Sequence, residues 1–140
     1  ACDMAVASTE AKFATSGINL GLFCATPGVP VSRNIPRKRA FEMLFTGEFI
    51  DAETALAWGL VNRVARPERL DAEIAALVEL IKAKPPAVCA DGKHLFYDQI
   101  ESTLADAYRM ASKAITLNMM GDDAGEGVGA FIEKRPPNWK

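Results

Sequence analysis

The spacing of apolar and polar positions divides the chain into three stretches. The first, residues 1–45, consists of short apolar runs separated by glycine and proline, which is typical of short strands and helices joined by turns. Pro27 favours the first turn of a helix, so Thr26 is the expected N-cap. The runs predict, in chain order, strands at 1–7 and 13–14, an apolar run at 18–23, a loop at 24–28, and helices at 27–35 and 36–45.

The second stretch, residues 46–64, contains one short helix between two turns. Asp51 can cap this helix, and the apolar positions that follow it recur near helical spacing. Gly59 then ends the helix, because glycine reaches the left-handed C-terminal cap without strain. Residues 60–64 predict a short strand or extended segment.

The third stretch, residues 65–140, has the longer apolar period of amphipathic helices. The clearest apolar stripe lies in a helix predicted at 67–83 and consists of Leu70, Ile74, Leu77, Val78 and Ile81. Further helices are predicted at 87–98, at 103–120 with Ser102 as cap, and at 122–134 with Asp122 as cap. These helices present more apolar faces than one small bundle can bury, so we expect association through this half.

Composition and charge narrow the partners. The 140 residues are 49% hydrophobic and carry a net charge of −2, so the chain can bury a core and has no overall field for nucleic acid or an acidic membrane. No apolar run approaches the roughly 20 residues that span a bilayer. We expect an intracellular protein. The chain opens within an apolar run, without an initiator or cap, and we interpret it as part of a longer protein.

Three cysteines, an odd number without metal-site spacing, predict reduced thiols. Cys2 and Cys24 have apolar neighbours and are expected to be buried small hydrophobes. His94 has no partner at ligand or triad spacing and is interpreted as a helix-surface or core-edge residue. The basic residues Arg33, Arg37, Lys38 and Arg39 are interpreted as a solvated helical face. The large aromatic residues Phe41, Phe45 and Trp58 are expected in the core.

The last predicted helix holds the remaining candidates for chemistry. Its carboxylates, at positions 122, 123, 126 and 133, are expected to complement the helix dipole rather than to act as acids and bases. An exposed Phe131 beside Lys134 and Arg135 has the chemistry to stack a purine and neutralise a phosphate. Composition alone makes this a weak signal for a nucleotide-bearing ligand.

Four segments together carry a family resemblance. They are Ala1-Cys2-Asp3-x-Ala5-x-Ala7, then Phe13-Ala14 leading to Ile18-Asn19-Leu20-Gly21, then Leu44-Phe45-Thr46-Gly47-x-x-Ile50-x-Ala52-x-x-Ala55-x-x-x-Gly59-Leu60-Val61-x-x-Val64, and Asp122-Asp123-x-x-Glu126-Gly127-x-x-Ala130-Phe131-x-Glu133-Lys134-Arg135-x-Pro137. In order and spacing the chain resembles the enoyl-CoA hydratase/isomerase (crotonase) family. Around residues 17–24 it is most similar to the hydratase-domain-containing-3 type of that family.

The resemblance implies an α/β fold: the carboxy-terminal portion of a ββα spiral, at residues 1–64, followed by a helical region at 65–140 that joins subunits into homo-trimers or hexamers. It implies acyl-CoA thioesters as substrates, with coenzyme A as part of the substrate and no tightly bound cofactor or metal. In the family two backbone N–H groups hold the thioester oxyanion. Two glutamates then manage the proton and the water that hydration of a 2-enoyl-CoA requires.

Carried over residue by residue, most of that machinery falls outside the chain. The oxyanion donors and the first glutamate precede the position matched by Ala1, and Gly17 stands where the second glutamate is expected. The family's glycine-rich loop is altered at 24–28, which implies that Cys24 faces the acyl pocket as part of its wall. Phe131 and Lys134 match the aromatic residue and lysine that meet the adenosine part of CoA.

Three interpretations therefore remain open. The chain is part of an enoyl-CoA hydratase-like enzyme, located in a bacterial cytoplasm or the mitochondrial matrix, and is inactive by itself. Alternatively it belongs to a non-catalytic acyl-CoA-binding or assembly module that has lost hydration through Gly17. A third interpretation is an isomerase or racemase of the family that uses a single acid.

Overall fold

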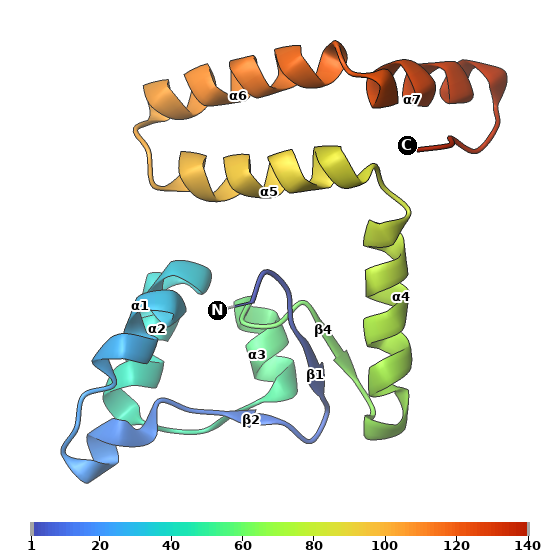
Figure 1. Cartoon of the computed structure of the whole chain (residues 1–140). Helices are drawn as coiled ribbons and strands as arrows, with labels where there is room; N and C mark the ends of the chain where they lie inside the picture. The colour runs from blue at the N-terminus through green and yellow to red at the C-terminus, as the bar shows by residue number, and fades with distance from the viewer. Residues whose placement is uncertain (1, 140) are drawn as a thin grey trace. The chain divides into compact units, whose positions relative to one another are not determined.

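The computed structural model describes residues 2–139, which form a mixed first half and a helical second half (Figure 1). Two compact units divide the chain, Ala1–Leu77 and Val78–Lys140. The boundary lies within a helix, α4 (Leu70–Lys82). The predicted division after residue 64 concerned the end of the spiral core and stays a prediction.

Two small sheets bring distant parts of the first unit together. Strand β1 (Val6–Ser8) runs parallel to β4 (Arg63–Ala65), and β2 (Lys12–Phe13) runs antiparallel to β3 (Ile50–Asp51). Figure 1 shows β1 and β4 side by side. Asn62 extends this pairing, because its backbone N–H donates to the Ala5 carbonyl and its side-chain oxygen accepts from the Ala5 N–H, both at 2.8 Å. The two pairings thus hold residues 6–8 against residues 63–65 and residues 12–13 against residues 50–51.

The first predicted elements are shifted in the structure. The predicted strand at 1–7 begins only at Val6, and position 1 lies outside the described residues. The apolar run at 18–23, for which no helix or strand was predicted, overlaps a 3-10 helix, η1 (Ser16–Leu20), which ends at Gly21 with φ 76°. A glycine at this left-handed position explains why the chain turns there.

The prediction of a loop at 24–28 with Thr26 as N-cap was wrong. Helix α1 (Ala25–Asn34) begins earlier, and Cys24 is its N-cap without a side-chain hydrogen bond. Pro27 therefore sits at the third helical position rather than the first. It is tolerated there because the first four N–H groups of a helix have no partner within the helix. Helix α2 (Arg37–Thr46) follows with Pro36 as N-cap, within one residue of the prediction.

The short helix α3 (Ala52–Trp58) confirms the prediction for residues 51–59. Asp51 Oδ1 accepts a hydrogen bond from the Thr54 N–H at 2.8 Å, and this bonding lowers the pKa of the Asp51 carboxyl. Gly59 ends the helix with φ 80°. Strand β4 begins three residues later than residue 60, because the Leu60 N–H is used in closing the helix, on the Ala55 carbonyl at 2.8 Å.

Alanines and medium-sized aliphatic side chains form the core of the first unit. Buried residues gather in two clusters, one of Ala7, Ala52, Ala55 and Val61 and one of Ile35, Ala40 and Met43. Phe41 and Phe45 were expected in this core and are 60% and 49% exposed. They lie one position away from the buried stripe of α2, on a different face, where their rings stack at 4.0 Å.

The remaining elements are helical: η2 (Pro67–Arg69), α4, α5 (Pro86–Ile100), α6 (Leu104–Met119) and α7 (Asp122–Glu133). Helices α5 and α6 run side by side as an antiparallel pair (Figure 1). Thr103, not Ser102, caps α6, since its hydroxyl accepts from the Asp106 N–H at 3.2 Å. Gly121, not Asp122, is the N-cap of α7. Of the described helices, none combines the length and apolarity of a membrane span.

Candidate functional site

Gly17 is required by the space around it. Its N–H points at the Cys24 sulfur at 3.3 Å, and its carbonyl accepts from the Leu22 N–H at 3.0 Å. A Cβ built on Gly17 would lie 2.7 Å from Cys24 Sγ and 2.8 Å from the Leu22 carbonyl oxygen. Real Cβ atoms essentially never approach other atoms so closely. This backbone therefore has no room for a side chain, and hence no room for a carboxylate, at position 17.

Two side chains hold the 3-10 helix that carries Gly17 against α2. The buried Thr15 hydroxyl donates to the Met43 carbonyl at 2.7 Å, and Asn19 Nδ2 donates to the Gly47 carbonyl at 3.4 Å. Gly47 ends α2 with φ 64°, and a Cβ there would meet Asn19 and Ile18 at 2.9 Å. The position of Gly17 is thus set by contacts far apart in the sequence.

The cysteines differ from their expected burial. Cys2 is exposed, and Cys24 is only half-buried. Cys24 lies outside the core, as the N-cap of α1, and its sulfur accepts a hydrogen bond from the Gly17 N–H. That Cys24 lines an acyl pocket stays a prediction. No three or more His, Cys, Asp or Glu side chains among the described residues are grouped to hold a metal ion.

Phe131 lies in the last turn of α7 and Lys134 is the C-cap that follows it; both are exposed, Phe131 by 84%. The chain reverses at Lys134, which has φ 55° and ψ 40°. Two backbone bonds close the helix there, from the Lys134 N–H to the Phe131 carbonyl at 3.3 Å and from the Arg135 N–H to the Ala130 carbonyl at 3.0 Å. The structure thus places the predicted aromatic and cationic residues together on one exposed helix end.

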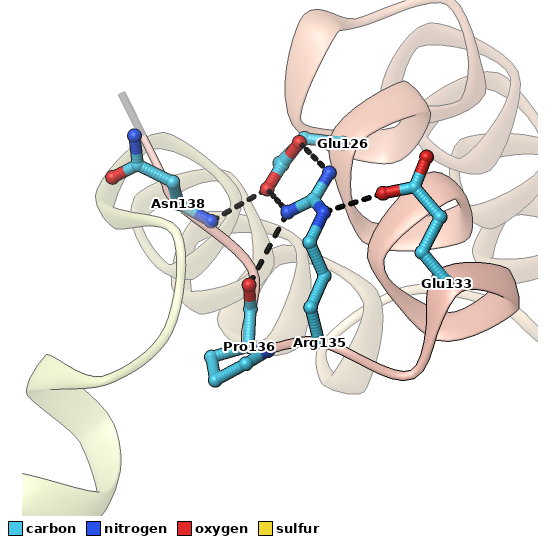
Figure 2. A network of polar contacts seen from close by, with 5 residues as sticks. All are labelled: Glu126, Glu133, Arg135, Pro136 and Asn138. Carbon is cyan, nitrogen blue, oxygen red and sulfur yellow. Dashed lines mark hydrogen bonds and ion pairs between the residues drawn. The ribbon is translucent and has the colours of Figure 1, made fainter.

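Arg135 is bound within its own helix end (Figure 2). Its guanidinium donates twice to Glu126, with Nη1–Oε1 at 2.6 Å and Nη2–Oε2 at 3.0 Å, and its Nε donates to Glu133 Oε2 at 2.6 Å. These bonds lower the pKa of Glu126 to about 2 and raise the pKa of Arg135. Glu126 and Glu133 therefore neutralise Arg135 rather than complement the helix dipole, which corrects the prediction for these two carboxylates.

Lys134 is the cation that remains available at this helix end. Its side chain makes no ion pair with any residue in the range 2–139, whereas Arg135 has three carboxylate oxygens around it. The sequence pattern presented Lys134 and Arg135 as equivalent charges beside Phe131. Only the structure separates them, because Glu126 lies nine residues before Arg135 and spacing alone does not reveal the pair.

The other candidates from the sequence lie on solvated helix surfaces. His94 is exposed on α5. The four basic residues at 33–39 are exposed, and Arg39 pairs with Glu42 at 2.9 Å and lies 5.0 Å from the centre of the Trp58 ring. Sequence reasoning missed an apolar groove between α5 and α6, lined by residues that include Leu95, Phe96, Leu104 and Tyr108.

Comparison with known proteins identifies similar chains over the whole length. A family model described as enoyl-CoA hydratase/isomerase matches residues 1–140. The mouse protein named enoyl-CoA hydratase domain-containing protein 3, mitochondrial, is 48% identical over 99% of this chain and 46% of its own length. A putative enoyl-CoA hydratase of Thermus thermophilus is 34% identical over 99% of this chain and 55% of its own.

Solved structures share the fold. A crystal structure of enoyl-CoA hydratase from Mycobacterium smegmatis superposes with a TM-score of 0.95 and 58% identity, covering 99% of this chain and 54% of that one. The crystal structure of human enoyl-CoA hydratase domain-containing protein 3 gives a TM-score of 0.92 and 45% identity, covering 99% and 55%. The predicted α/β fold class is thereby confirmed. The chain spans about half the length of the curated relatives that it matches.

Proposed function

Because the chain belongs to the enoyl-CoA hydratase/isomerase family, we propose that it forms the carboxy-terminal half of a hydratase-like protein that binds acyl-CoA thioesters. Its relatives are about twice as long, and their carnitinyl-CoA dehydratase and enoyl-CoA hydratase names refer to CoA thioester chemistry. In this proposal coenzyme A is part of the substrate, and no other cofactor is tightly bound.

The exposed pair of Phe131 and Lys134 is the observation that carries the proposal. An aromatic ring that is 84% exposed costs free energy in water and offers a flat face to a purine. Lys134 supplies a positive charge one turn away, and a phosphate oxygen is its natural partner. Adenosine and phosphate are joined in coenzyme A, so one ligand satisfies both side chains.

The test is the CoA affinity of Lys134→Ala in the full-length protein that carries this chain. A charge-assisted hydrogen bond contributes about 1.5–3 kcal/mol, so we expect affinity to fall roughly tenfold or more. Binding of an acyl-pantetheine, which lacks the nucleotide, is expected to stay unchanged. Lys113→Ala, at an exposed lysine of α6, is the matched control. Unchanged CoA affinity of Lys134→Ala in a folded protein contradicts the assignment.

For the chemistry, we propose hydration of 2-enoyl-CoA by the full-length protein, with the acid and the oxyanion donors supplied from outside this chain. Water addition needs one group to place hydroxide and another to deliver a proton, and position 17 supplies neither. The 140 residues alone are therefore expected to show no turnover of crotonyl-CoA. Turnover by this chain alone would refute the proposal.

A non-catalytic acyl-CoA-binding or assembly module is the second candidate, and the packing around Gly17 favours it. A side chain at this position meets backbone as well as Cys24, so the loss of an acid there is built into the loop rather than caused by one substitution. CoA binding without turnover of crotonyl-CoA by the full-length protein would favour this candidate. Double-bond isomerisation or racemisation with a single acid would favour the third interpretation.

We further propose that the protein assembles as a homo-trimer or hexamer through its helical part. Large apolar side chains are exposed along α6, where Leu104 is 76% and Tyr108 is 69% exposed. Apolar area of this kind is usually covered by a partner. Sedimentation of the full-length protein measures the assembly state.

The mouse and human relatives carry the word mitochondrial in their names, and we propose the mitochondrial matrix or a bacterial cytoplasm as the location.

A further inference from the structure

We propose that Glu126 and Arg135 are positioning residues: they hold Lys134 in its left-handed backbone conformation and thereby present its charge to the nucleotide phosphates of CoA. The inference rests on the proposed function of Lys134 and extends it to residues that touch no ligand. Four observations on the end of α7 support it.

Lys134 is the sole non-glycine residue with positive φ in the range 2–139. The other three positions are Gly21, Gly47 and Gly59. An L-residue with a long side chain adopts this conformation only at a cost, and such a residue persists where the surrounding structure determines it. The presence of lysine where glycine is the ordinary choice indicates that the side chain at this position is needed.

Arg135 determines the reversal from its C-terminal side. It follows Lys134 directly, and its guanidinium returns to two carboxylates on α7, those of Glu126 and Glu133. Figure 2 shows the guanidinium between them. The two-point contact with Glu126 fixes the plane of the guanidinium as well as its distance, because both oxygens are used. The backbone between Glu133 and Arg135 must then turn back at Lys134.

The segment after Arg135 is held on the same helix. The Asn138 N–H donates to Glu126 Oε1 at 2.6 Å, so one carboxylate binds both the guanidinium and the tail. The Trp139 indole lies on Gly127, where an added Cβ would meet the ring at 3.2 Å. The indole N–H donates to the Ala83 carbonyl at 2.9 Å. Lys134 is therefore fixed from both sides, by α7 before it and by the anchored tail after it.

The adjacent cations Lys134 and Arg135 have different roles. Nε, Nη1 and Nη2 of Arg135 are all committed to carboxylates, and Nη1 also donates to the Pro136 carbonyl at 3.2 Å. These bonds use four of the five guanidinium N–H groups, which leaves Arg135 a single N–H for a phosphate. Lys134 has no such partner within residues 2–139, and the cluster of Arg135 with two glutamates leaves its charge uncancelled by a direct contact.

The experiment is a double-mutant cycle on CoA affinity in the full-length protein. Arg135→Lys keeps the charge and removes the two-point contact, because an ammonium group has no planar fork. We expect it to weaken CoA binding about threefold to tenfold through loss of the fixed Lys134. In the Lys134→Ala background the same change is expected to have little further effect. Arg109→Lys, at an arginine paired with Asp106 at 2.6 Å on α6, is the control.

The outcomes separate this inference from the proposed function. If Lys134→Ala weakens binding and Arg135→Lys does not, the positioning role is overturned and the function of Lys134 stands. Equal losses in both backgrounds also overturn it, because Arg135 then acts independently of Lys134. If Lys134→Ala has no effect, both proposals fail. Should Arg135→Lys prevent folding, Glu126→Gln, which keeps the shape of the side chain, enters the same cycle with the same expectation.

Discussion

Helices α3 and α7 end with the same pair of backbone hydrogen bonds but with different residues at the reversal. At α3 the Gly59 N–H donates to the Leu56 carbonyl at 3.0 Å and the Leu60 N–H to the Ala55 carbonyl at 2.8 Å. At α7 the equivalent bonds, to Phe131 and Ala130, measure 3.3 and 3.0 Å. This is the Schellman geometry in both cases. The reversing residue is glycine in one and lysine in the other.

The dihedral angles show that the two ends make different demands. Gly59 has φ 80° and ψ 17°, outside the small left-handed region of L-residues, whereas Lys134 at φ 55° and ψ 40° lies within it. The α3 end needs no side chain to hold it, and it leads directly into the buried Val61. The α7 end is fixed by the ionic contacts of Arg135. A side chain at the α7 reversal therefore has backbone angles open to L-residues, whereas a side chain at the α3 reversal would be strained by its backbone angles.

The largest effect is expected at Gly17, a glycine that is required by the space around it rather than by its φ. Gly17→Ala places a Cβ against Cys24 Sγ and the Leu22 carbonyl, and we expect a loss of about 1–3 kcal/mol in the free energy of unfolding. Adding Cys24→Ala to Gly17→Ala is expected to restore only part of the lost stability, since the Leu22 carbonyl remains in contact with the new Cβ. Gly92→Ala, in open space on α5, is the control and is expected to stabilise slightly. Urea denaturation measures all three, and a fully stable Gly17→Ala would contradict the close approach.

The next effect tests the glycine end of the comparison directly. Gly59→Lys imposes a left-handed conformation on an L-residue, and we expect a loss of about 1–2 kcal/mol in the free energy of unfolding. A collision does not contribute, because the nearest atom to a Cβ at Gly59 is the Asn34 carbonyl oxygen at 4.0 Å. Thermal and urea unfolding of this variant would show no loss if the two helix ends were equivalent.

The reverse exchange, Lys134→Gly, is expected to change stability and binding in opposite directions. Glycine relieves the left-handed conformation but loses more entropy on folding, which leaves a net gain of about 0.5 kcal/mol in the free energy of unfolding. The CoA affinity of the full-length protein is expected to fall about tenfold with loss of the ammonium group. Calorimetric unfolding and titration with CoA on the same sample measure both. A variant that is less stable and binds CoA equally well would remove the functional reason for the lysine.

The predictability of the fold from sequence follows the same division. Signals that act within one turn were sufficient: the Asp51 cap and the Gly59 stop were located correctly, because each bonds to residues three or four positions away. The start of α1 was not, since a proline fits any of the first helical positions. The exposure of Phe41 and Phe45 was also missed, because a helical stripe can be shifted by one position without changing its spacing.

At the candidate site, too, features set by neighbouring residues were predicted and contacts between distant residues were not. Exposure of Phe131 and Lys134 at a helix end was foreseen from their place beside charged residues. The ion pair between Arg135 and Glu126 was not foreseen, because it depends on a reversal of the chain at Lys134, a residue that is not glycine. The packing of Cys24 on Gly17 needed coordinates as well, since it depends on an intervening turn that the sequence presents only as an apolar run. Contacts of this second kind are the ones on which the proposed roles depend.

The smallest expected effect is a selective release of the α7 end in acid. Hydrogen bonds, first from the Arg135 guanidinium and then from the Asn138 N–H, lower the pKa of Glu126 from its ordinary 4.5 to about 2. A lowered pKa means that the contribution of Glu126 to stability is complete above pH 4.5 and is lost as pH falls toward 2. In NMR titrations of the folded protein, the Glu126 carboxyl and the Lys134 amide are expected to share that low midpoint. The Gly59 amide, whose helix end has no such carboxylate, is expected not to follow it. A Glu126 midpoint near 4.5, or equal shifts at Gly59 and Lys134, would show that the ionic cluster does not distinguish the two ends.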